Sequence, residues 1–177
     1  DFHGVYDYLI VTVGSTWYFF DSYTGNWHYT LTNVPGGDIV QGPKGEILIY
    51  TLNQANGWLT LWNSTNIPAL YASPEPGSMG WGQWRAMGKT IDATGPVVGP
   101  GPNNPLGLNG YQWNKTVPIG LPGSYQETLD DRIIGSTLPA YTGTAAGRSL
   151  KEITFWGISL KSGQEGQLLF NKTWSAP

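Results

Sequence analysis

Residues 8–63 form a succession of short apolar runs that are separated by glycine-containing turns. In YLIVTVGSTWYFF (8–20) most residues are β-branched or aromatic, and Gly14-Ser15 interrupts the run. Such residues suit a pleated strand, and glycine supplies the positive φ that a tight bend requires. Helical periodicity of 3.6 residues is hard to find in these runs. This segment therefore predicts two strands joined by a bend and, more broadly, an all-β fold.

The same pattern continues along the chain. DSYTGN (21–26) predicts a turn that the Asp21 side chain caps, with Gly25 at positive φ, and WHYTLTN (27–33) predicts a third strand. Residues 38–63 predict three further strands, which a Gly-Pro-Lys-Gly turn and an Asn-Gly turn connect. Strands are predicted again within DDRIIGST, EITFWGISL and GQLLFNKTW.

Composition narrows the class of function. The chain has 177 residues, enough for one sizeable core. Its net charge is −3 and only 12% of its residues are charged, so it offers no basic surface for nucleic acid. Cysteine is absent, which excludes disulfides and thiolate metal sites.

No apolar run approaches the roughly 20 residues that span a bilayer, so we expect no membrane insertion. The start at Asp1, without Met, suggests a processed or fragmentary chain.

Residues 72–110 differ from the rest because they are rich in proline and glycine. A connection of this length is usually functional or packed against the fold. Trp81 and Trp84, with Gln83 and Arg85 beside them, are candidates for stacking on sugar rings. The alternative is that both indoles are buried and anchor the connection to the sheets.

Two distant segments of the chain are similar. VTVGSTWYFFDSYTGNWHYTLTN and RIIGSTLP…FWGISLKSGQEGQLLFNKTW each contain a strand ending in Gly-Ser-Thr, an aromatic strand, a Ser/Thr-Gly turn and a last aromatic strand. An aromatic residue followed by asparagine recurs at Asn63, Asn114 and Asn171, at the end of each expected closing strand. A four-stranded unit that recurs about every 50 residues suggests the blades of a β-propeller.

These segments resemble the blades of PQQ-like β-propellers, the family of the quinoprotein dehydrogenases and of many non-catalytic cell-surface relatives. The similarity covers residues 8–33, 38–63 and 130–174. It implies antiparallel four-stranded blades, about three in number, in segments of about 8–33, 38–63 and 110–174, with residues 72–110 as a long connection. It also implies blade-turn glycines and tryptophans packed between neighbouring sheets: Gly25, Gly57 and Gly163, and Trp17, Trp62, Trp113 and Trp156.

About three blades cannot close a ring, because propellers usually have at least four. We therefore expect a partial propeller that assembles with further blades of the same polypeptide or with other copies of itself. Its end faces should carry apolar side chains that such partners cover. The expected residues are Tyr8, Ile10 and Trp17 near the start, and Phe155, Trp156, Leu168 and Phe170 near the end.

Asn63, Asn114 and Asn171 also begin the sequons NST, NKT and NKT. One interpretation is N-glycosylation at exposed strand ends, more on Asn63 and Asn114 than on Asn171. The other interpretation is that the three similar motifs only mark the recurring end of a strand and carry no sugar.

Candidate catalytic residues are few. His3 and His28 have no partner pattern around them, and Asp130-Asp131 is better explained as a turn than as a calcium site or an acid/base pair. Enzymes of the resembled family hold their quinone in a complete ring with calcium-liganding Glu, Asn and Asp, often beside adjacent cysteines. Because this chain has neither the ring nor cysteine, we expect no catalysis and no cofactor.

The expected function is therefore structural: a non-catalytic extracellular or cell-surface propeller segment, glycosylated and held in a larger assembly. Two alternatives stay open. One is a carbohydrate-binding or glycan-processing propeller module, with glycans as partners, and the other is a fragment of a PQQ-dependent dehydrogenase.

Overall fold

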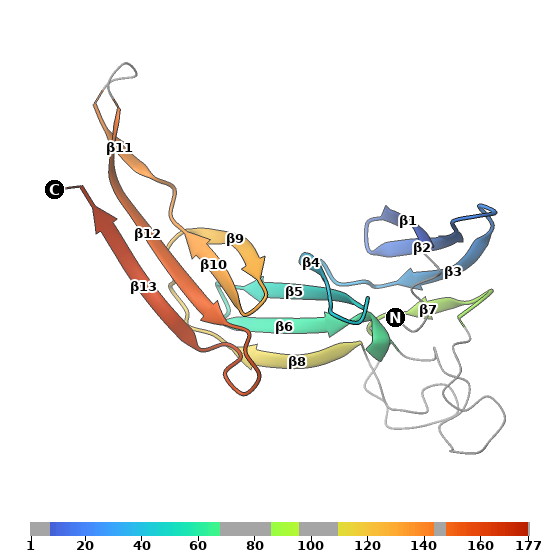
Figure 1. Ribbon diagram of the computed structural model, residues 1–177. Coiled ribbons are helices and arrows are strands. Elements are labelled where there is room, and N and C mark those ends of the chain that lie inside the picture. Colours follow the sequence, from blue (N-terminus) through green and yellow to red (C-terminus); the bar gives the residue numbers. More distant parts are fainter. Residues whose placement is uncertain (1–7, 68–85, 96–109, 144–147, 177) are drawn as a thin grey trace. The chain divides into compact units, whose positions relative to one another are not determined.

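The computed structural model describes residues 8–67, 86–95, 110–143 and 148–176. Over these residues the chain is all-β, and its one helical element is the short 3-10 turn Ser64–Asn66. The strands form three sheets (Figure 1). The predicted all-β class is confirmed, whereas propeller blades stay a prediction. In the described part of the chain no helix combines the length and the apolar character that crossing a membrane requires.

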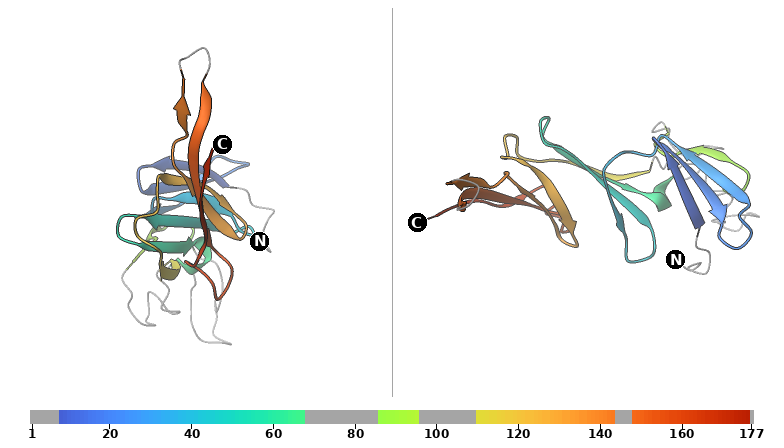
Figure 2. Two further views of the ribbon diagram at one scale, coloured as in Figure 1. Left: turned by 90° about the vertical axis from the view of Figure 1, so that its left-hand side faces the viewer. Right: turned by 90° about the horizontal axis from the view of Figure 1, so that it is seen from above.

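The first sheet has the strand order β1-β2-β3-β7, and its first three strands lie side by side in chain order (Figure 2). Gly14, at φ 58°, lies in the bend between β1 and β2, and Gly25, at φ 72°, lies in the turn between β2 and β3. Both turns and all three strands agree with the sequence prediction. The bounds are β1 Tyr8–Val13, β2 Thr16–Asp21, β3 Trp27–Thr32 and β7 Thr90–Asp92.

The fourth strand of this sheet was not predicted. β7 comes from the segment that the sequence marks as a connection, and it pairs with β3 in parallel, with Leu31 opposite Ile91. The first sheet is therefore not wholly antiparallel, unlike the expected blade.

The second sheet has the order β4-β5-β6-β8. Asn63 N–H donates to Gly110 O at 2.8 Å, and Val117 N–H donates to Gly57 O at 2.9 Å. These two bonds join opposite ends of β6 and β8, which therefore run antiparallel. The bounds are β4 Asp38–Gln41, β5 Ile47–Asn53, β6 Trp58–Asn63 and β8 Tyr111–Thr116.

The third sheet is built around the long strand β12, which pairs with β10 and β11 along one edge and with β13 along the other. β12 and β13 run side by side in both Figure 1 and Figure 2. The hairpin between β9 and β10 turns at Asp130-Asp131, as predicted. The bounds are β9 Ser124–Leu129, β10 Arg132–Ser136, β11 Ala140–Thr142, β12 Ser149–Ser159 and β13 Leu168–Ser175.

The chain forms two compact units, residues 1–51 with 61–113 and residues 52–60 with 114–177. The first unit has an aromatic core. Phe19 and Tyr29 stack with ring centroids 4.3 Å apart, and Trp17 of the first sheet meets Trp62 of the second edge-on at 6.5 Å. Trp62 is fully buried. The contact between these two tryptophans agrees with the expected packing of tryptophan between neighbouring sheets.

Trp62 also holds two chain segments together. Its indole Nε1 donates to Ala93 O at 2.8 Å. Gly110 lies so close that an added Cβ would overlap both the Trp62 indole and Ala93 O, and its N–H donates to Asn66 O at 2.7 Å. At φ 82°, Gly110 also needs the left-handed backbone that glycine permits. The chain therefore returns at residue 110 to the place that it leaves after residue 93.

The second unit packs around Trp156, whose side chain is fully buried. Its Nε1 donates to Pro122 O at 2.7 Å, and its ring lies against Gly135 on the neighbouring strand. Ile133 and Ile158, opposite one another on β10 and β12, are buried as well.

Candidate functional site

The Asn63 sequon is built into the fold. Asn63 ends β6 and is only 8% exposed. Its Oδ1 accepts from Thr65 N–H at 2.9 Å and from Thr65 Oγ1 at 2.8 Å, while its Nδ2 donates to Gln112 Oε1 at 3.0 Å. Attachment of a sugar needs the amide nitrogen to be accessible, and here that nitrogen is engaged in a side-chain hydrogen bond. The geometry suits a strand cap better than a glycan acceptor.

Asn114 and Asn171 lie differently. Both are exposed, and each lies inside a strand, β8 and β13 respectively, rather than at a strand end. The expectation that all three asparagines end their strands is therefore wrong for these two. Because side chains alternate along a strand, each of these asparagines shares its face with the threonine of its sequon, Thr116 or Thr173. Both threonines are exposed.

The predicted sugar-stacking residues lie outside the described residues. They are Trp81, Gln83, Trp84 and Arg85. His3 lies outside them too.

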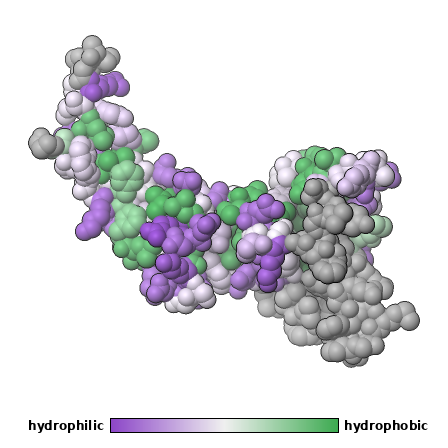
Figure 3. Space-filling model, in the orientation of Figure 1, coloured by the Kyte–Doolittle hydropathy of each residue, from purple (hydrophilic) through white to green (hydrophobic). Residues whose placement is uncertain are grey.

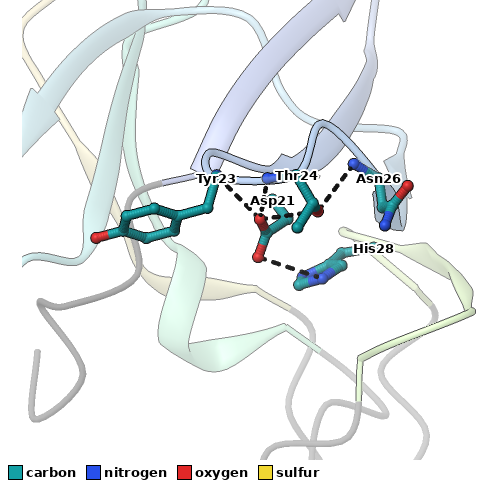
Figure 4. A network of polar contacts seen from close by, with 5 residues as sticks. All are labelled: Asp21, Tyr23, Thr24, Asn26 and His28. Atoms are coloured by element: carbon teal, nitrogen blue, oxygen red, sulfur yellow. Dashed lines mark hydrogen bonds and ion pairs between the residues drawn. The ribbon is translucent and has the colours of Figure 1, made fainter.

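His28 belongs to a polar network around the turn between β2 and β3 (Figure 4). Asp21 Oδ1 accepts from the N–H groups of Tyr23 and Thr24, at 2.9 and 2.7 Å, and from Thr24 Oγ1 at 2.9 Å. Asp21 Oδ2 lies 3.8 Å from His28 Nε2. The backbone hydrogen bond from Thr24 is the largest cause that holds the pKa of Asp21 below its ordinary value. The carboxylate caps the turn as predicted, and its engaged oxygens leave it poorly placed to act as a general base.

Asp131 has a similar structural role at the β9–β10 hairpin. Its carboxylate accepts from Arg132 Nε at 2.7 Å and Arg132 Nη2 at 2.9 Å, and Lys161 Nζ lies 3.4 Å from Oδ2. The hydrogen bonds from Arg132 are the main cause that lowers the pKa of Asp131 to about 2. Among the described residues no three His, Asp or Glu side chains group as metal ligands. Asp131 therefore pairs with cations of the protein itself.

The most unusual exposed feature is β1. Leu9, Ile10, Val11 and Val13 are between 41% and 63% exposed, and β1 is an edge of its sheet. Figure 3 shows apolar surface over the position of β1 and β2 in Figure 1. Most natural edge strands are protected from such exposure by charges, proline or bulges, because an open apolar edge pairs with other strands.

Both faces of β1 are apolar. Ile10 lies opposite Phe19, on the face that packs into the core, whereas Leu9 lies opposite Phe20 and Val11 lies opposite Tyr18 on the other face. We call that second face the outer face. Its apolar side chains are Leu9, Val11, Val13, Tyr18 and Phe20, and Thr16 lies on it opposite Val13.

The third sheet also exposes apolar side chains. Phe155, Leu168 and Trp174 are 42%, 43% and 48% exposed. Figure 3 shows apolar surface over the position of β12 and β13.

The expectation of apolar end surfaces is therefore right for Ile10, Phe155 and Leu168. It is wrong for Trp17 and Trp156, which are core residues with 6% and 0% exposure. Tyr8 and Phe170 are intermediate.

Sequence reasoning missed Leu9, Val11, Val13 and Trp174 as surface residues. The signal was present for β1, because an uninterrupted YLIVTV offers apolar residues to both faces of a strand, whereas a half-buried strand alternates apolar and polar residues.

Comparison with known proteins adds no assignment: no protein-family model matches this chain, and neither the curated proteins nor the solved structures contain a match.

Proposed function

We propose that this chain is a non-catalytic structural segment of an extracellular or cell-surface β-sheet protein, in which its sheets act as propeller-like blades that pack against further blades or other copies of the chain. The observation that carries this proposal is the open apolar edge and outer face of β1. Apolar exposure on consecutive residues of an edge strand is typical of a surface that another chain covers.

The energetics support a covered surface. Leu9, Val11 and Val13 are each at least half exposed. Burying apolar side chains of this size stabilises by about 1.5–3 kcal/mol each when burial is complete. Covering the three would therefore be worth a few kcal/mol, comparable with a substantial part of a domain's stability of about 5–15 kcal/mol.

The arrangement of the sheets supports the blade interpretation. Two sheets each contain three neighbouring antiparallel strands, β1-β2-β3 in one and β10-β12-β13 in the other. In each, the sequence Gly-Ser-Thr lies at or beside the first strand. The parallel pairing of β7 is the feature that fits blades least. Exposed sequons at Asn114 and Asn171 support a glycosylated extracellular location.

The test is the association state of the 177-residue chain. Sedimentation velocity over a wide concentration range should show self-association or poor solubility. A dilution-resistant monomer that melts cooperatively would contradict the proposal, because it would show that the apolar edges are tolerated in water.

Two sets of variants locate the surface responsible. One set replaces Leu9, Val11 and Val13 with threonine, which keeps β-propensity and removes apolar surface. The other makes the same change at Phe155, Leu168 and Trp174. At least one set should reduce association. The matched control is Leu138→Thr, because Leu138 is 88% exposed but lies outside the strands, so its loss should change nothing.

A further inference from the structure

β1 is distinguished from the other edge strands by its lack of charge. YLIVTV contains no Asp, Glu, Lys or Arg, no proline and no glycine. It pairs with β2 over six consecutive residues without a register shift, so no bulge twists its outer edge away. Among the described strands, no other strand pairs with this edge.

Every other described edge strand of four or more residues contains a charged residue. The charged residues are Asp38 in β4, Lys115 in β8, Glu127 in β9 and Lys172 in β13. A charge on an edge strand opposes pairing with an apolar partner. β1 alone among them lacks this protection.

We propose that β1 pairs with β1 of a second copy of the chain, antiparallel, about a two-fold axis beside Val11. The inference rests on the proposed structural function and names its partner. The symmetric register places Val11 opposite Val11, Leu9 opposite Val13, and Ile10 opposite Thr12. Opposed β-branched and apolar side chains stabilise an antiparallel pair, and no charge meets another group anywhere along it.

The second copy is the occupant that the charge pattern favours. Because β1 carries no charge, it cannot select a strand of another protein by charge complementarity. Among the described edge strands of four or more residues, the uncharged one that could pair with it is β1 of another copy. In an antiparallel ladder alternate residues direct N–H and C=O away from the existing partner, so two such edges satisfy each other's backbone groups. A two-fold contact of identical surfaces also closes, giving a dimer rather than a fibre.

The faces of β1 determine the register. In the register centred on Val11, the outer faces of the two copies lie on the same side and form one apolar surface, continuous through Tyr18 and Phe20. A shift of one residue would place the outer face of one copy beside the core face of the other, opposing Val11 to Ile10. The symmetric register therefore keeps each copy's core face continuous with that of its partner.

The absence of cysteine makes the proposal directly testable, because a single introduced cysteine reports one contact. Opposed residues in an antiparallel pair bring Cβ atoms to roughly 5 Å, near the spacing that a disulfide spans. Val11→Cys should therefore give a disulfide-linked dimer under mild oxidation. Leu9→Cys and Val13→Cys should crosslink to each other when the two proteins are mixed, more than either crosslinks to itself.

The matched control is Asp92→Cys. Asp92 is exposed and lies on β7, at the opposite edge of the same sheet, so its cysteine should remain monomeric. Val11→Lys should weaken dimerisation by roughly tenfold or more, because two like charges would meet at the axis. Val11→Thr keeps the β-branched shape and should weaken it less. Circular dichroism of each variant shows that the monomer is folded.

The outcomes separate this inference from the proposed function. Crosslinking of Val11→Cys, with the expected heterologous pair, supports both. Association that persists without any crosslink on β1, and that Val11→Lys does not weaken, overturns the β1 dimer but leaves the structural function standing through another surface. A wild-type chain that stays monomeric at all concentrations overturns both.

Discussion

Replacing Gly135 with alanine tests how the second unit is packed. Gly135 lies on β10 opposite Trp156, and an alanine Cβ would overlap three carbons of the Trp156 ring. Its backbone is not in the left-handed region, so the substitution adds no conformational strain. The whole effect should come from the clash with the indole.

The expected loss of stability has two sources, the strain of moving the Trp156 indole and the loss of its hydrogen bond. Trp156 is fully buried, so moving it costs about 1–3 kcal/mol of overpacking strain. If its Nε1 loses the hydrogen bond to Pro122 O, an unsatisfied buried donor costs a further 1–3 kcal/mol or so. We expect Gly135→Ala to lower the free energy of unfolding by about 2–6 kcal/mol, a large part of a typical total.

Urea unfolding followed by circular dichroism gives the measurement. Gly36→Ala is the control, since an added Cβ there meets no atom within 4 Å and the change should stay within about 0.5 kcal/mol. In a Trp156→Phe background the smaller ring should relieve the clash, so Gly135→Ala should cost at least about 1 kcal/mol less. An equal cost in both backgrounds, or a wild-type midpoint for Gly135→Ala, would refute this account of the packing.

Three further predictions follow from the polar contacts. In material from a glycosylating host, peptide mapping should find glycans on Asn114 and Asn171 and none on Asn63, whose amide is buried and hydrogen bonded; an occupied Asn63 would mean that this strand end opens. Asp131 has a pKa of about 2, below the ordinary 3.8, so its ion pairs stabilise the fold above pH 4 and are lost as pH falls from about 4 to 2. The unfolding free energy of Asp131→Asn should therefore fall less steeply across that range, and identical slopes would contradict it. Trp62→Phe removes the donor to Ala93 O and should cost at least about 1–3 kcal/mol in urea unfolding, whereas an unchanged midpoint would show that this bond contributes nothing.

Most of the strands could be predicted from the sequence, because their signals are local. Short runs of β-branched and aromatic residues, separated by turn glycines such as Gly25, define β1 to β6 without knowledge of their partners. β7 could not be predicted in this way. Its three residues, Thr90–Asp92, carry no periodicity, and they form a strand only because β3 offers them an edge.

The candidate site shows the same division. The sequence locates each sequon, but whether an asparagine is accessible depends on groups that are distant in the sequence. The Asn63 amide nitrogen, for example, is engaged because it donates a hydrogen bond to Gln112 Oε1. Exposure of β1 likewise depends on which strand ends the sheet, and strand order is a non-local property. Pattern alone could not separate the buried Trp156 from the exposed Phe155 beside it, because both residues are large and aromatic.

The contacts of the Trp62 indole with Ala93 and Gly110 have a consequence for engineering the chain. Ala93 and Gly110 both lie against the same indole, so the number of residues between them is uncoupled from the pairing of β7 with β3 and of β8 with β6. Closing a longer loop costs little, about 0.6 kcal/mol for each doubling of its length. A peptide tag, a protease site or a whole folded module inserted between residues 96 and 109 should therefore leave the aromatic core of the first unit intact.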